Sequence, residues 1–78
     1  MKAEILSFDG DGAETVKCVW TLAASGGAVC SSPSDQSWME EVGVVTSQGP
    51  VYPKDGRAFI EGLPREFSGS LIRARLVP

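Results

Sequence analysis

Residues 2–23 read KAEILSFDGDGAETVKCVWTLA, and this stretch has the pattern of a β-hairpin. Residues 2–8 and 14–23 alternate between apolar and polar side chains, which is typical of strands with one face on a core. Between them, residues 9–12 contain two aspartates and two glycines, the residue types that tight turns favour. The sequence therefore predicts two antiparallel strands joined by a turn.

The position of this turn sets the expected register of the hairpin. If residues 9–12 form the connection, apolar residues face apolar residues and an acid faces a base across the strands. The expected partners are Ile5 with Val16, Ala3 with Cys18, and Glu4 with Lys17. In the second strand, the period of two places one apolar set on a single face, namely Val16, Cys18, Trp20 and Leu22.

The acidic turn also raises the question of a calcium loop. An EF-hand loop needs oxygen ligands at its positions 1, 3, 5 and 12, and a glycine at position 6. Counted from Asp9, position 3 is Asp11, but positions 5, 6 and 12 are Ala13, Glu14 and Trp20. The spacing therefore favours a hairpin turn over a cation site, and we do not expect calcium to bind there.

The remaining segments alternate between strand and helix patterns. A short third strand is expected at 28–31, a helix at 33–41, a strand at 42–47, a short extended piece at 51–52, a second helix at 54–63 and a last strand at 70–77. This order predicts one α+β domain over residues 1–78, with a mixed or mostly antiparallel sheet of four to five strands packed by two short helices.

The element order resembles the β-grasp arrangement, in which an opening hairpin is followed by a helix, further strands and a closing strand. The resemblance covers the coarse layout of the whole chain and involves no specific motif. The last four residues are RLVP, whereas ubiquitin-like and sulfur-carrier members of that fold end in Gly-Gly. The resemblance therefore implies neither conjugation nor sulfur transfer.

Composition excludes several functional classes. The chain has 78 residues, of which 42% are hydrophobic, so it is expected to fold as a globular domain. It contains no histidine, which removes the commonest general base and metal ligand. There is no signal peptide pattern and no apolar run long enough to cross a membrane, so we expect a soluble cytoplasmic protein. The net charge of −3 does not suggest nucleic acid as a partner.

The two cysteines, Cys18 and Cys30, lack the CxxC spacing of redox or zinc motifs. A turn near residues 25–27 would offset them along neighbouring strands, too far apart for an easy disulfide. Buried structural thiols are therefore favoured over a disulfide or a reactive thiol. No catalytic, metal or cofactor site is predicted.

Four residues are candidates for binding a partner. Arg73 and Arg75 lie on one face of the last strand, where they pair with carboxylates of neighbouring strands, face an anionic partner, or protect an exposed sheet edge from pairing with another strand. Trp38 and Tyr52, together with Met39, could form an exposed patch. For Trp38, however, burial in the core is favoured, because so small a domain needs its large side chains inside.

The sequence favours a non-enzymatic protein-interaction or accessory module, acting on an unidentified partner or as a homodimer. One alternative is a small-ligand-binding protein or atypical enzyme with a pocket between the helix at 54–63 and the sheet. Another is weak nucleic-acid binding through the last strand. Neither alternative has a motif behind it.

Overall fold

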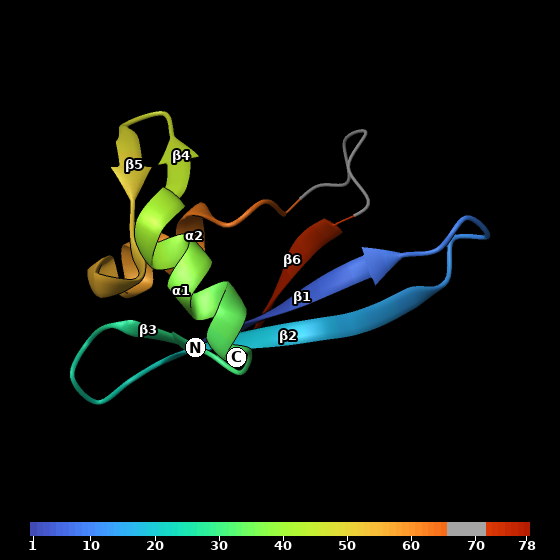
Figure 1. Cartoon of the computed structure of the whole chain (residues 1–78), viewed down its shortest axis with the longest axis horizontal. Coiled ribbons are helices and arrows are strands. Elements are labelled where there is room, and N and C mark those ends of the chain that lie inside the picture. The colour runs from blue at the N-terminus through green and yellow to red at the C-terminus, as the bar shows by residue number, and fades with distance from the viewer. Residues whose placement is uncertain (66–71) are drawn as a thin grey trace.

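The computed structural model describes residues 1–65 and 72–78 of the chain (Figure 1). Its strands and helices follow the predicted order. They are β1 (Lys2–Phe8), β2 (Glu14–Leu22), β3 (Ala28–Cys30), α1 (Pro33–Val42), β4 (Val44–Thr46), β5 (Gly49–Val51), the 3₁₀-helix η1 (Pro53–Asp55), α2 (Arg57–Gly62) and β6 (Ile72–Val77). The first two positions of the strand predicted at 70–77 lie outside the described residues.

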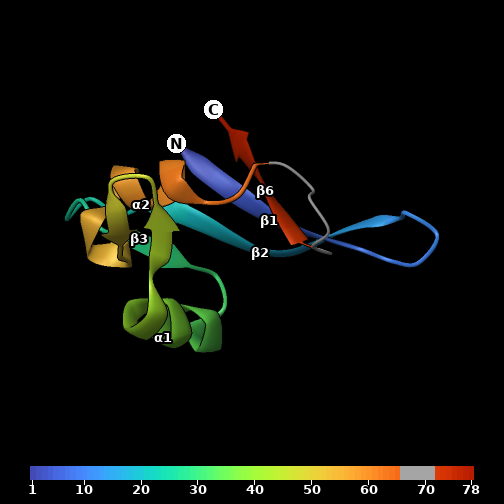
Figure 2. The same cartoon turned by 90° about the horizontal axis from the view of Figure 1, so that it is seen from above.

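The prediction of a single small α+β domain is confirmed. Four strands form an antiparallel sheet in the order β3-β2-β1-β6, and β4 and β5 form a separate antiparallel hairpin. Seen from above, α1 lies to one side of this sheet, and β4 and β5 stand beside α2 (Figure 2). No described helix is long and apolar enough to cross a membrane.

The predicted register of the first hairpin is wrong because the strands are joined by a longer turn and interrupted by a bulge. Asp9 and Ala13 close the turn through a 3.0 Å backbone hydrogen bond. Ile5 pairs with Cys18, whereas the next residue, Leu6, pairs with Val16 and leaves Lys17 as the extra residue. Such a bulge breaks the period of two.

The bulge also changes which side chains face the core. Cys18 and Trp20 are buried, as predicted, but Val16 is 47% exposed. Val16 lies beyond the extra residue and therefore no longer shares their face. An inserted residue of this kind leaves no signature in the alternation of the strand, so the sequence pattern could not reveal it.

Helix α1 begins and ends close to the predicted positions, for the predicted reasons. Ser32 caps it by accepting a hydrogen bond from the Asp35 amide, and Pro33 occupies the first turn. The helix predicted at 54–63 is instead divided at Gly56 into η1 and α2. Gly56 has φ +60°, which is outside the helical region, so the backbone changes direction there.

The core lies between the sheet and α2. Phe59 and Ile60 of α2 are both fully buried, and Leu63 follows them into the same cluster, as the predicted apolar stripe requires. The Phe59 ring packs edge-on against Trp20 with their centroids 4.7 Å apart. On the sheet side the cluster includes Ala3 of β1 together with residues of β2, β3 and β6.

Two glycines allow the helical elements to approach the rest of the chain closely. A Cβ atom on Gly62 would lie 3.1 Å from Thr46 and 3.2 Å from Val51, so the β4–β5 hairpin rests against α2 at this position. A Cβ atom on Gly56 would collide with the carbonyl oxygen of Gly26, in the β2–β3 turn. The contact between Gly56 and Gly26 packs the start of α2 against the β2–β3 turn at the edge of the sheet.

The Gly56→Ala variant is therefore expected to lose about 2–4 kcal/mol of unfolding free energy, from the positive φ and the collision together. The matched control is Gly10→Ala, because an added Cβ at Gly10 meets no atom within 4 Å. Urea unfolding of both variants measures the difference. Equal stability of Gly56→Ala and the wild type would contradict the close approach.

Candidate functional site

A half-open cavity lies between α1 and the sheet and encloses about 230 Å³. Its walls are almost wholly apolar. The apolar walls come from Ile5, Trp20, Trp38, Met39, Leu63, Pro64 and Ile72, while Lys17, Cys18, Asp35 and Arg73 also line it. Leu63 and Pro64, which follow α2, reach this cavity, whereas Phe59 and Ile60 of the helix itself are buried in the core.

Two of the four predicted partner-binding residues line this cavity, and the other two do not. Trp38 and Arg73 line it, whereas Arg75 and Tyr52 are not among its lining residues. Tyr52 is half-buried and packs over Gly43, where a Cβ atom would lie 2.8 Å from the tyrosine ring. The proposed patch of Trp38 with Tyr52 is therefore not a feature of the cavity.

The favoured burial of Trp38 is wrong, since its side chain is 58% exposed. No residue of α1 is buried, and Met39 is the residue of that helix that packs against the core cluster. The core cluster is already filled by Trp20 and Phe59, which leaves Trp38 at the rim of the cavity. Its exposure keeps Trp38 a candidate for contact with a partner.

Arg73 and Arg75 pair with carboxylates of neighbouring strands, which is the first of the roles that the sequence predicted for them. Arg73 lies 3.1 Å from Glu14, and Arg75 lies 2.6 Å from Glu4 and 3.8 Å from Glu14. The hydrogen bonds that Arg75 donates to the Glu4 carboxylate, and the negative charge of that carboxylate, raise the pKa of Arg75. Arg73 also stacks over the Phe8 ring at 5.2 Å. Much of the arginine charge on β6 is thus balanced within the sheet.

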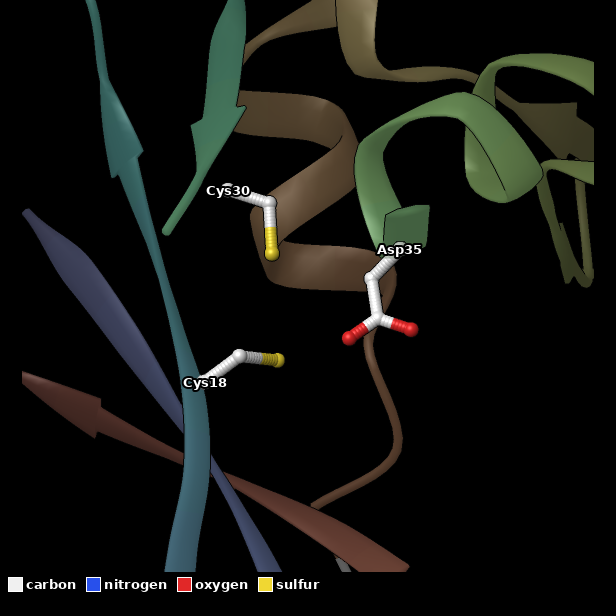
Figure 3. A group of neighbouring side chains, drawn as sticks. All are labelled: Cys18, Cys30 and Asp35. Carbon is white, nitrogen blue, oxygen red and sulfur yellow. The ribbon is translucent and has the colours of Figure 1, made fainter. Parts of the chain in front are cut away.

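Two of the lining residues, Cys18 and Asp35, form with Cys30 a cluster that the sequence did not predict. Donor atoms of Cys18, Cys30 and Asp35 all lie within 4.8 Å of one another (Figure 3). Cys18 comes from β2, Cys30 from β3 and Asp35 from the first turn of α1. Both thiols are free and buried.

The cysteines were expected to be offset along their strands, and the observed register brings them closer. Cys30 pairs with Trp20, so Cys18 is its diagonal neighbour on the same face of the sheet. The β2–β3 turn closes with the Ala23 amide donating to the Gly27 carbonyl, which shifts the pairing from the expected one. The favoured interpretation of buried thiols agrees with their burial.

Hydrogen bonds fix the short segment that joins Cys30 to helix α1. The Ser32 amide donates to the Cys30 sulfur at 3.4 Å, and the Cys30 amide donates to the Gln36 side-chain oxygen at 2.7 Å. The Gln36 side chain in turn donates to the Ala28 carbonyl at 3.4 Å. These contacts position Cys30 and Asp35 together at the start of α1.

The acidic hairpin tip makes no comparable cluster. Asp11 accepts a hydrogen bond from the Ala13 amide at 3.0 Å, as in an aspartate-stabilised turn. Within residues 1–65 and 72–78, one group of three potential metal ligands is found, and it consists of Cys18, Cys30 and Asp35. The geometry of the tip agrees with the turn that the sequence predicts.

Searches against protein-family models, curated proteins and solved structures found no match for this chain. The resemblance to the β-grasp arrangement therefore rests on the order of the elements alone.

Burial, together with the neighbouring Cys30 and Asp35, raises the pKa of the Cys18 thiol from 9.0 to about 12. Below pH 9 the thiol is protonated in both the folded and the unfolded chain. Between pH 9 and 12 the unfolded chain ionises it first, so the free energy of unfolding should fall as the pH rises through this window.

Urea unfolding between pH 7 and 11, under reducing conditions, measures this decline against a Cys18→Ala variant. The variant is less stable at pH 7, and the difference between the two proteins should shrink above about pH 9. Contributions that the two proteins share cancel in the comparison. A difference that stays constant up to pH 11 would contradict the raised pKa.

Proposed function

We propose that this domain is a non-enzymatic protein-interaction module that receives one large apolar side chain of a partner in the cavity beneath α1. The observation that carries this proposal is the half-open apolar cavity beside the exposed indole of Trp38. Anchor side chains in desolvated pockets contribute most of the affinity of many protein interfaces, and tryptophan is enriched among them.

The size of the cavity favours a side chain over a larger ligand. Its volume of about 230 Å³ is below the roughly 300–1,000 Å³ of pockets that enclose drug-sized molecules. A dry cavity of about 150 Å³ already holds benzene, so the available space suits an aromatic or branched aliphatic side chain. The few polar atoms of the walls supply little of the convergent hydrogen bonding that orients a substrate.

The charged strand β6 supports nucleic-acid binding less well. Arg73 and Arg75 meet Glu4 and Glu14, whose carboxylates would repel phosphates. The aromatic side chains that stack bases in RNA-binding sheets are also missing from β6. The apolar cavity therefore remains the better-supported contact surface.

Affinity capture from a lysate of the source organism, quantified by mass spectrometry, tests this function with three baits besides the wild type. Trp38→Ala removes the rim of the cavity and should reduce capture about 30-fold, as expected for a binding hot spot of about 2 kcal/mol. The control Val45→Ala removes another exposed apolar side chain, 84% exposed on β4, and should capture as much as the wild type.

The third bait, Arg75→Glu, tests the surface of β6 outside the cavity, because Arg75 is not among the residues that line it. A partner that is lost with this bait and retained by Trp38→Ala would contradict the cavity as the contact surface. If the wild type captures nothing, binding of small aromatic compounds is measured by NMR at the Ile5 and Met39 methyl groups. Shifts confined to those methyl groups would then assign the cavity to a small ligand instead of a protein.

A further inference from the structure

We propose that Cys18, Cys30 and Asp35 bind a zinc ion, whose fourth coordination position opens on the cavity beneath α1. Three potential ligands from three different elements converge on one point, with their donor atoms within 4.8 Å of one another (Figure 3). This proposal goes beyond the interaction function and does not depend on it, because a metal ion can bind whether or not a partner does.

The chemistry of the donors selects the metal. Thiolates are soft ligands that calcium and magnesium avoid, since both prefer oxygen. Zinc accepts a mixture of cysteine sulfur and aspartate oxygen and is usually tetrahedral. Two thiolates and one carboxylate therefore supply three of the four ligands of a tetrahedral zinc ion. In sites with three protein ligands, water or another molecule occupies the fourth position.

The geometry requires only small movements. Zinc–sulfur bonds of about 2.3 Å and zinc–oxygen bonds of about 2.0–2.2 Å place tetrahedral ligands roughly 3.5–3.8 Å apart. The donor atoms of the cluster, at most 4.8 Å apart, would approach by about 1 Å. Cys18 and Asp35 also line the cavity, which gives a metal ion a path to the site and gives its fourth ligand space.

The surroundings of Cys30 resemble the outer shell that supports a thiolate ligand. The Ser32 amide already points at its sulfur and would stabilise negative charge there. The side-chain oxygen of Gln36 accepts a hydrogen bond from the backbone amide of Cys30 and so keeps the sulfur near the start of α1. The helix dipole also favours negative charge at that end of the helix.

The charge balance is also favourable. Binding converts two neutral thiols into thiolates and releases both protons to water, while the Asp35 carboxylate enters as it is. Two thiolates, one carboxylate and Zn²⁺ together carry a net charge of −1. Lys17 also lines the cavity on which the complex would open.

The simpler interpretation is a pair of buried thiols hydrogen-bonded to a carboxylate. Among the described residues Asp35 makes no ion pair, so its half-buried carboxylate would then rest against two sulfur atoms without a compensating cation. The two interpretations describe the same metal-free fold and differ in whether a thiophilic ion binds.

Titration of the reduced protein with Co²⁺ separates them, because tetrahedral cobalt thiolates have a sulfur-to-metal charge-transfer band. The chain has two cysteines and no histidine, so this band can come only from Cys18 and Cys30. We expect one cobalt ion per chain and displacement by an equivalent of Zn²⁺. A missing band at saturating cobalt, or one metal ion shared by two chains, would overturn the proposal.

Variants locate the ligands. Cys18→Ser, Cys30→Ser and Asp35→Asn should each weaken binding by more than about 100-fold, a larger effect than the loss of an outer-shell contact. The control Asp11→Asn changes a carboxylate at the hairpin tip and should bind like the wild type. Wild-type affinity in either serine variant would overturn the site, and wild-type affinity in Asp35→Asn would remove Asp35 from it.

The Gln36→Ala variant tests the site when a serine variant does not fold. It retains all three ligands and removes the contact that holds Cys30, so affinity should fall about 10–100-fold. Zinc should also raise the thermal midpoint of the wild type, and the same concentration of Mg²⁺ should not. An equal rise with both ions would show non-specific binding and would overturn the proposal.

Discussion

The contact between Trp20 and Phe59 joins the two halves of this domain. Trp20 is 2% exposed and pairs with Ala3 on one side and Cys30 on the other. Phe59 brings α2 against it, from a distant part of the sequence. A buried aromatic residue of this size contributes about 3–5 kcal/mol, which is a large share of the stability of so short a chain.

The position of α1 follows from this core. Because Trp20 and Phe59 already fill the space between sheet and α2, α1 packs at the edge through Met39 and leaves a cavity beneath it. Trp38 stands at the rim of that cavity, and Asp35 turns toward the thiols of β2 and β3. The apolar cavity and the thiol–carboxylate cluster are therefore two consequences of the same packing.

The local patterns of the sequence were sufficient for the order of the strands and helices and for the fold class. Alternation identified β1, β2 and β6, the Ser32–Pro33 cap identified α1, and the spacing of Phe59 and Leu63 identified the buried face of α2. Each of these signals acts within a few residues, where side-chain period and capping hydrogen bonds dominate. The pairing of Arg73 and Arg75 with carboxylates followed from the same kind of pattern.

Only the tertiary structure decided the register of the strands, the exposure of Trp38 and the meeting of Cys18, Cys30 and Asp35. The bulge at Lys17 and the β2–β3 turn at residues 23–27 each shift the pairing by a residue or more, and such shifts leave the composition of a strand unchanged. Gly56 interrupts a helical pattern because its backbone meets Gly26 across the fold. These outcomes depend on contacts between residues distant in the sequence, and no local pattern contains them.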